Sequence, residues 1–291
     1  MFGKKYIVLA ILFLSPLLSL SGWEITSTYN LEWDTKTFYI DITAHRQSSD
    51  PSLPSARPAA EHAIERALPI ICLNTAAEIP VDSRHTLGEI MEGDKSILAA
   101  LRDLYLQAER SSSNFTKDLS GLEVRYSFSM FPDLAQPLIL HNQAFMGEQR
   151  LDWEPTGPFT GILIYAKGQL PEYGKTGTTL LKPCLFPEMY DQDMNLLSAP
   201  YMVSPEILGD RGPVTYAYSL KDPRVRDIIG YYPMRIAADA VFGTRPTNPV
   251  IPSEWGDKIR SSRYIQTLIS EGKVVLIIED PSVSSSSSAG P

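Results

Sequence analysis

The stretch Thr160–Asp193, TGILIYAKGQLPEYGKTGTTLLKPCLFPEMYDQD, carries the strongest local signals in the chain. Its apolar run Ile162–Tyr165 predicts a buried strand, because a short continuous apolar run is typical of a strand covered on both faces. A Gly-rich segment follows, and we expect a mobile hairpin loop over Gln169–Thr179. The stretch then continues as a strand-like segment, Leu181–Met189, and closes in an acidic turn.

The sequence Gly174-Lys175-Thr176 within this loop is similar to the end of a phosphate-binding loop. That motif needs four residues between its first Gly and the Gly-Lys-Thr, and a helix must follow at once. Here Gly168 and Gly174 are separated by five residues, and Thr178–Pro183 favours extended chain. We therefore expect neither a nucleotide nor any other cofactor at this loop.

Asp191, Asp193 and Asn195 have the spacing of the first ligands of an EF-hand calcium loop. In that loop a Gly stands where this chain has Leu196, and a bidentate Glu stands where it has Met202. A solvated β-turn is therefore the favoured interpretation.

The remaining reactive side chains are scattered. The histidines and cysteines lack the short spacings that are typical of metal sites, and no serine-nucleophile motif is present. The adjacent carboxylates Glu279 and Asp280 would point to opposite faces of a strand. A Ser/His/Asp triad assembled only by folding stays open, but the sequence predicts no catalytic, cofactor-binding or metal-binding residue. The histidines are His45, His62, His85 and His141.

Cys72 and Cys184 are the two cysteines. In an oxidising compartment they could form one disulfide that joins the two halves of the chain. We favour two buried free thiols, because Cys72 lies in an apolar run and free cysteine is commonly buried.

The first residues predict export. Lys4 and Lys5 precede the apolar segment Tyr6–Leu14, and small residues follow near Gly22, which together are typical of a secretory signal peptide. An uncleaved N-terminal anchor is the alternative. No later segment is apolar enough to span a bilayer, so we expect membrane contact only through the signal segment. The net charge of −8 argues against a nucleic-acid partner.

Periodicity along the chain predicts an α+β fold. We expect two small domains, each a mainly antiparallel sheet with helices packed on one face, and 23 Pro and 18 Gly residues indicate many turns. The expected strands are Ser27–Trp33 and Thr37–His45 as a hairpin, Leu122–Phe131, Thr160–Ala166, Val214–Tyr218, Tyr231–Phe242 and a central Lys273–Asp280. The expected helices are Ala59–Ala77 with a kink or restart at Pro69, one capped by Asp94, and one capped by Ser253 and interrupted at Ser261-Ser262.

These elements suggest a division of the chain. Residues 1–21 form the signal peptide, 22–150 the N-terminal domain, 151–281 the C-terminal domain and 282–291 a disordered Ser-rich tail. The polar connector His141–Pro158 carries the boundary.

The order of several segments resembles that of a family of bacterial exported proteins. The segments are the Ala-rich helix before Val81-Asp82-Ser83, then Thr86–Ile90, Pro158–Gly168, Tyr201–Glu206, Pro249–Ser253 and Val274–Asp280. Together they are similar to the periplasmic flagellar assembly protein T and to an envelope lipoprotein family named after a Helicobacter lipoprotein. The departures are the absence of a lipobox Cys, the presence of Pro69 and the segment Gln169–Thr179, which looks like an insertion.

This resemblance implies a binding or scaffolding role rather than an enzymatic one. The implied partners are envelope or flagellar basal-body proteins, and the implied location is the periplasm or the medium, or an association with the outer membrane. A periplasmic hydrolase or small-ligand carrier, with a site assembled from distant residues, is the alternative function. Self-association is a further alternative, should the final strand lie at a sheet edge.

Overall fold

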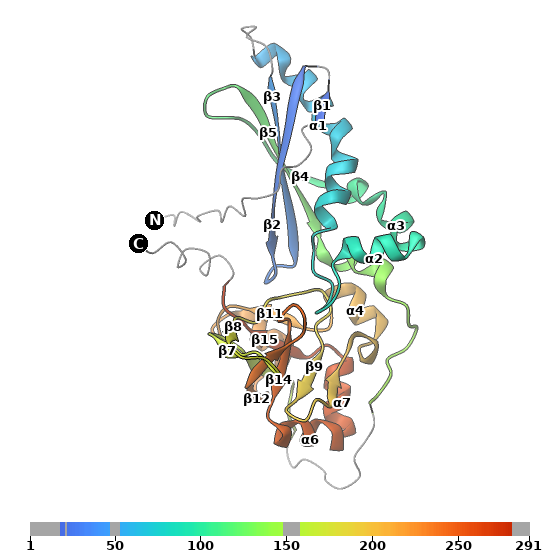
Figure 1. The fold of residues 1–291 in the computed structure, drawn as a ribbon, viewed down its shortest axis with the longest axis vertical. Coiled ribbons are helices and arrows are strands. Elements are labelled where there is room, and N and C mark those ends of the chain that lie inside the picture. Colours follow the sequence, from blue (N-terminus) through green and yellow to red (C-terminus); the bar gives the residue numbers. More distant parts are fainter. Residues whose placement is uncertain (1–17, 21, 47–52, 148–157, 281–291) are drawn as a thin grey trace. The chain divides into compact units, whose positions relative to one another are not determined.

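The computed structural model describes residues 18–20, 22–46, 53–147 and 158–280 (Figure 1). The chain forms two compact units, here called the first and second domain. Of the described residues, the first comprises those through Glu78 together with Gly88–Leu134, and the second comprises Ile79–Leu87 and those from Ala135 onward. Residues 79–87 and 135–147, which we placed in the N-terminal domain, thus belong to the second unit. The expected boundary between residues 150 and 151, most of the signal segment and the Ser-rich tail lie outside the described residues.

The first domain is built on an antiparallel sheet of order β1-β2-β3-β5-β4. The hairpin that we expected is confirmed, and the alternation in β5 buries Leu122, Val124 and Phe128 on one face. The helix α1 packs against β2, β3 and β5, which covers this sheet (Figure 1). The strands are β1 (Leu18–Leu20), β2 (Trp23–Glu32), β3 (Thr37–Arg46), β4 (Glu109–Phe115) and β5 (Gly121–Ser129).

The helix α1 (Leu53–Ala76) begins earlier than expected and does not end at Pro69. A proline inside a helix removes one backbone hydrogen bond and costs about 3 kcal/mol. The buried side chains on both sides of Pro69, including Ile64 and Ile71, offset this cost by packing. Of the two alternatives at Pro69, the restart is therefore wrong, and the kink stays a prediction. The cap is confirmed: Asp94 accepts from the Ser96 N–H at 2.8 Å and begins α3 (Lys95–Leu101). The other helical segments are α2 (Leu87–Gly93), η1 (Leu104–Gln107) and η2 (Met130–Leu134).

The second domain contains a sheet of order β11-β15-β6-β12 in which every pair is parallel. Our expectation of a mainly antiparallel sheet is wrong here. Parallel strands need long crossover connections, whose helices cover both faces of the sheet. In agreement with this, all four residues of β15 are buried. The central position of the final strand is confirmed, so self-association through it as an edge has no basis. The strands are β6 (Ile162–Tyr165), β11 (Thr215–Ala217), β12 (Met234–Ala237) and β15 (Val274–Ile277).

A second, mixed sheet of order β10-β9-β14-β13 completes the strand framework of this domain. The strand expected over residues 181–189 is reduced to its last residue, because Pro183 and Pro187 cannot donate backbone hydrogen bonds. The strands are β9 (Met189–Asp191), β10 (Leu196–Ser198), β13 (Ala240–Phe242) and β14 (Asn248–Ile251), with a separate hairpin of β7 (Leu170–Pro171) and β8 (Thr178–Thr179).

Helices pack against the sheets of the second domain. Val225 and Ile229 of α5 pack against Leu163, Val275 and Ile277 of the parallel sheet. The interruption of the last helix is confirmed, since Ser262 caps α7 by accepting from the Ile265 N–H. Ser253 is the first residue of α6 rather than its cap, which is Pro252. The helical segments are η3 (Gln136–Leu138), η4 (Pro200–Met202), α4 (Pro205–Arg211), α5 (Pro223–Ile229), α6 (Ser253–Ser261) and α7 (Arg263–Ser270). None of the helices in the described part of the chain has the length and hydropathy needed to cross a bilayer.

Both cysteines are free and buried, as we favoured. Cys72 lies in α1 of the first domain and Cys184 in the second. The backbone of Cys184 is held by Tyr216, whose hydroxyl accepts from the Cys184 N–H at 3.1 Å and donates to its carbonyl at 3.0 Å. Burial raises the pKa of each thiol to about 12.

We expect neither thiol to react with iodoacetamide at pH 8 while the protein is folded. The thiolate is the nucleophile, and a pKa near 12 leaves about one thiol in 10⁴ ionised at that pH. The unfolded chain ionises its thiols near pH 8.5, so the free energy of unfolding falls as the pH rises from there toward 12. Mass spectrometry of alkylated protein, with and without urea, checks the first point. Rapid labelling of the folded protein would contradict it.

Candidate functional site

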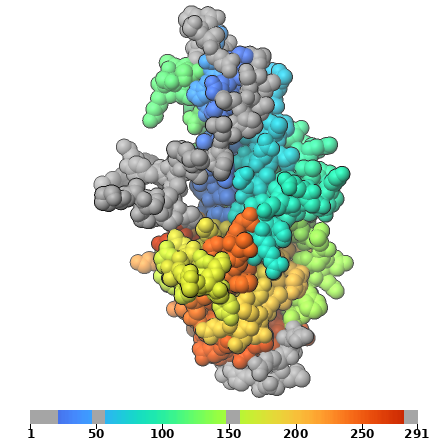
Figure 2. Space-filling model, in the orientation of Figure 1, coloured from blue at the N-terminus to red at the C-terminus, as the bar shows by residue number. Residues whose placement is uncertain are grey.

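The Gly-rich loop is a hairpin bound to its neighbours rather than a phosphate site. Tyr173 donates its N–H to the Val241 carbonyl at 2.8 Å, and its hydroxyl donates to the Gln192 carbonyl at 2.8 Å. Lys175 pairs with Glu172 at 3.0 Å. The strand β8, and not a helix, follows the Gly-Lys-Thr sequence. The predicted hairpin is confirmed, and its mobility stays a prediction. Figure 2 shows this segment, in yellow, at the surface of the second domain.

The acidic turn is confirmed as a turn, but its first residue is not solvated. Asp191 is fully buried, and its carboxylate accepts from the Asp193 N–H at 3.0 Å and from the Asn195 N–H at 2.8 Å. The Asn195 amide nitrogen also donates to it, at 2.8 Å to Oδ2. The carboxylate therefore closes the turn from inside, which leaves it unsuited to the calcium role that its spacing suggested.

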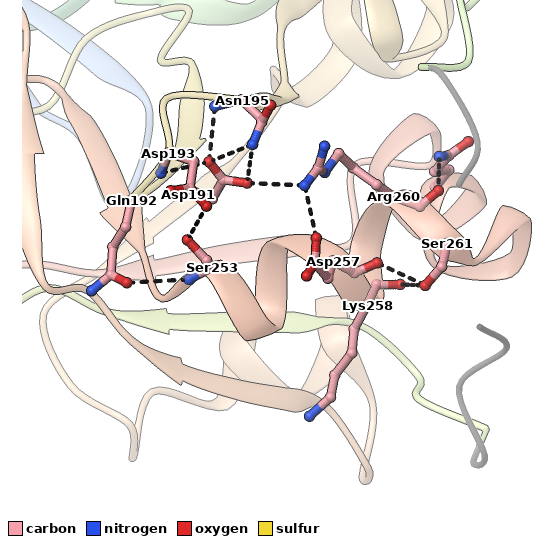
Figure 3. Close-up of polar contacts among 10 residues, drawn as sticks. Asp191, Gln192, Asp193, Asn195, Ser253, Asp257, Lys258, Arg260 and Ser261 are labelled. Atoms are coloured by element: carbon pink, nitrogen blue, oxygen red, sulfur yellow. Dashed lines mark hydrogen bonds and ion pairs between the residues drawn. The ribbon is translucent and has the colours of Figure 1, made fainter. Parts of the chain in front are cut away.

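Helix α6 lies directly against this turn (Figure 3). Gly256 makes the approach possible, because a Cβ at that position would lie 2.7 Å from Oδ2 of Asp191. Arg260 Nη2 bonds to Asp257 at 2.7 Å and forms an ion pair with Asp191 at 3.5 Å. Ser253 donates its hydroxyl to Asp193 at 2.7 Å. The turn and the helix thus form one polar cluster around a buried carboxylate.

A cavity of about 340 Å³ opens beside this cluster, within the second domain. Apolar residues are the more numerous in its wall, but polar atoms form about half of the exposed lining, and Asn195, Arg260 and Gln266 are the polar side chains there. Gln266 is 7% exposed and donates to the Arg260 carbonyl at 3.2 Å. The wall consists of residues 145–147, 195–197, 201–202 and 259–260, with Gln266 and Ile269.

The reactive side chains named from the sequence do not converge on this cavity. No Ser, His or Asp is among its lining residues. His85 pairs with Asp82 at 3.1 Å, and His141 contacts the Val203 carbonyl at 2.9 Å. Within the described ranges, no group of three His, Cys, Asp or Glu side chains is placed to hold a metal ion.

A second feature, which the sequence reasoning missed, is a set of exposed aromatic residues that we call the tyrosine surface: Tyr231, Tyr232 and Tyr264. Tyr231 and Tyr232 are 73% and 74% exposed, and Tyr264 is half-exposed. Phe159 and Thr160, which precede β6, hydrogen-bond to two of these tyrosines. Tyr264 donates its hydroxyl to the Phe159 carbonyl at 2.8 Å, and Thr160 exchanges hydrogen bonds with the backbone of Tyr232, each 3.0 Å long.

Glycines allow this close approach of two loops. Gly230 has φ +69°, and a Cβ there would lie 2.7 Å from Oγ1 of Thr160. A Cβ at Gly161 would lie 2.5 Å from Cβ of Ile229. Two adjacent tyrosines directly after Gly230, the residue that caps the end of α5, are visible in the sequence. The exposure of these tyrosines could not be predicted from the sequence, because it depends on how this loop packs against residues 159–161.

Two domain families match the chain. Residues 24–137 match the N-terminal domain of Treponema pallidum Tp0624, and residues 161–280 match the second domain of that protein. No curated protein matches the chain. These descriptions name neither the flagellar protein nor the Helicobacter lipoprotein, so that resemblance stays a prediction. Over both of its α+β domains, therefore, the chain is similar to two consecutive domains of Treponema pallidum Tp0624.

Proposed function

We propose that the protein is an exported, non-enzymatic protein of the cell envelope that binds other envelope proteins. The observation that carries the proposal is the tyrosine surface, with Tyr231 and Tyr232 each about three-quarters exposed. Tyrosine is enriched at protein interfaces because its ring buries a large area at a small cost in conformational entropy, while its hydroxyl still finds a hydrogen-bond partner. The backbone of Tyr232 is already fixed by Thr160, which lowers the entropy cost of docking.

A strand edge adjoins the tyrosine surface. β12 begins two residues after Tyr232 and pairs with β6, and no other strand in the described part of the chain pairs with its outer side. Such an edge can accept an extended segment of a partner through backbone hydrogen bonds. Arg226 stacks over Tyr231 at 5.5 Å, and Arg235 on β12 is exposed. These arginines favour a partner segment that carries acidic side chains.

The compartment and the class of partner rest on other observations. Export rests on the leader sequence of residues 1–21, and the envelope role rests on the resemblance to exported bacterial proteins. The base of a flagellar motor is one candidate location, and that same resemblance is its only support.

Photo-crosslinking in living cells tests the proposal. A benzophenone amino acid at Tyr232 is expected to capture an envelope protein, which mass spectrometry then identifies. The matched control carries the same group at Leu106, which is 66% exposed in the first domain. Capture of the same proteins with the same yield from Leu106 would sink the proposal. Capture of basal-body proteins that is lost in a strain without flagella would assign the flagellar location.

The double variant Tyr231→Ala/Tyr232→Ala is expected to reduce this capture at least ~10-fold, since buried tyrosines at interfaces are often worth more than 1 kcal/mol each. For this comparison the crosslinking group is placed at Arg235, in the exposed part of β12. The free energy of unfolding is expected to stay within about 0.5 kcal/mol, because both side chains are exposed. Undiminished capture by the double variant would argue against the tyrosine surface.

A further inference from the structure

We propose that the envelope partner binds as a fifth strand of the parallel sheet, through a segment in which apolar and polar residues alternate and an acidic residue lies beside Arg235. The inference rests on the proposed function and names the form of the partner's bound segment. β12 is an end strand in the sheet order β11-β15-β6-β12, so a strand added to its outer edge extends the sheet by one.

The backbone groups of β12 face β6 at every second residue. The N–H groups of Met234 and Ala238 donate to carbonyls just before and within β6, at 2.8 and 2.9 Å. Because successive residues of a strand direct their backbone groups to alternate sides, the N–H and carbonyl of Arg235 and of Ala237 point away from β6. A further strand on this side can therefore reach them.

These outward backbone groups are open to a partner. Apart from the pairing with β6, no hydrogen bond within the described residues involves the backbone of Arg235 or of Ala237, and both residues are exposed. Pro233, directly before β12, agrees with this direction. A proline has no N–H and is tolerated at a sheet edge where its nitrogen faces away from the neighbouring strand. An incoming strand can thus bond to both N–H groups and both carbonyls without breaking an existing pair.

The side chains of β12 define the residue pattern that fits beside it. Met234 and Ile236 are buried on one face, with 0% and 2% exposure, whereas Arg235 and Ala237 are exposed on the other. Residues that lie side by side on neighbouring strands share a face of the sheet. A partner residue beside Met234 or Ile236 is therefore expected to be apolar, and the residues between such positions are expected to be polar.

Charge selects the partner residue beside Arg235. Arg235 lies on the exposed face of β12, and Arg226 stacks over the ring of Tyr231 at 5.5 Å, near the start of the strand. Just beyond the other end of β12, Asp239 accepts a hydrogen bond from Gln192 at 2.7 Å. Opposite charges on neighbouring strands attract, and like charges directly opposite repel. An acidic residue is therefore expected beside Arg235, and a neutral one toward Asp239.

Heteronuclear NMR of the ¹⁵N-labelled full chain tests the pattern with two matched peptides. The first is acetyl-Ser-Val-Thr-Val-Glu-Val-Thr-Val-Ser-amide, and the second has Lys in place of Glu. We expect the Glu peptide to shift the backbone amide peaks of Arg235 and Ala237 in a saturable way, and the Lys peptide to bind at least ~3-fold more weakly. The absence of saturable shifts at these amides, shifts confined to the edge strand β4 of the first domain, or equal affinity for the two peptides would overturn the proposal.

Two variants separate the backbone hydrogen bonds from the charge. Ala237→Pro removes one outward N–H and keeps the hydrogen bonds to β6, so the Glu peptide is expected to bind at least ~5-fold more weakly while the melting temperature stays unchanged. Arg235→Glu is expected to reverse the preference, so that the Lys peptide binds more tightly than the Glu peptide. Unchanged affinity in Ala237→Pro, or an unchanged preference in Arg235→Glu, would refute strand addition at β12.

Crosslinking in cells distinguishes strand addition from the protein-binding proposal. With the benzophenone group at Tyr232, Ala237→Pro is expected to reduce capture of the envelope partner at least ~5-fold. Undiminished capture in Ala237→Pro, together with lost capture in Tyr231→Ala/Tyr232→Ala, would leave the protein-binding proposal standing and contradict strand addition. Undiminished capture in both variants would contradict both.

Discussion

Asp191→Ala is expected to lower the free energy of unfolding of the second domain by about 3–5 kcal/mol, the usual result of removing one partner of a buried ion pair. Asp191 has no solvent exposure, and it accepts from the backbone N–H groups of Asp193 and Asn195 and from the Asn195 side chain. Without the carboxylate these donors lose their acceptor inside the protein. Arg260, whose side chain is 23% exposed, also loses one of its two carboxylate partners.

Asp193→Ala is the matched control, because it removes a carboxylate from the same turn. Asp193 is exposed and accepts one hydrogen bond, from the Ser253 hydroxyl, so a loss of about 1 kcal/mol or less is expected. Urea unfolding followed by hydrogen exchange of peptides from β9 and α6 reports on the second domain by itself. Equal losses in the two variants would mean that Asp191 is not the centre of the cluster.

Gly161→Ala is expected to destabilise the second domain by about 3 kcal/mol, at the upper end of the usual cost of overpacking a core. The added Cβ would lie 2.5 Å from Cβ of Ile229, 2.6 Å from its Cα and 2.7 Å from its Cγ2. Contact with Cα means that backbone must move, and Ile229 is buried against the parallel sheet. The movement would displace Gly230 and the tyrosines that follow, so crosslinking through Tyr232 should fall as well.

Gly93→Ala provides the comparison for this substitution. Gly93 is the last residue of α2, and a Cβ there would meet nothing within 4 Å. Because alanine loses less backbone entropy on folding than glycine, we expect the variant to be as stable as the wild type or more stable by about 0.4–1 kcal/mol. Thermal unfolding of both variants is the measurement. A small effect of Gly161→Ala, similar to that of Gly93→Ala, would show that the two loops can separate at little cost.

Local signals predicted much of the first domain. The alternation in residues 122–130 identified β5 and its buried face, and Asp94 identified the start of α3. Both signals act over a few neighbouring residues, through side-chain alternation in one case and one side-chain-to-backbone hydrogen bond in the other. Pro69 left a kink and a restart of the helix as alternatives, and the restart is wrong because packing of α1 against the sheet outweighs the lost hydrogen bond.

The parallel sheet could be predicted only in part. The apolar residues of β6 and β15 indicated strands covered on both faces, and the central position of β15 followed from that pattern. Whether the strands pair in parallel or antiparallel did not follow from that pattern. It depends on the helices that return the chain to the same edge of the sheet, and short strands carry no record of their partners.

The sequence by itself determined the α+β class, the positions of most strands and helices, and the leader-like character of the first residues. Tertiary structure alone decided that Asp191 is buried, that Arg260 lines a cavity, and that Tyr231 and Tyr232 remain exposed. The physical reason is that secondary structure follows from neighbouring residues, whereas burial and exposure follow from contacts between distant segments. Gly256 against Asp191 and Gly161 against Ile229 are two such contacts, and each depends on the absence of a single Cβ.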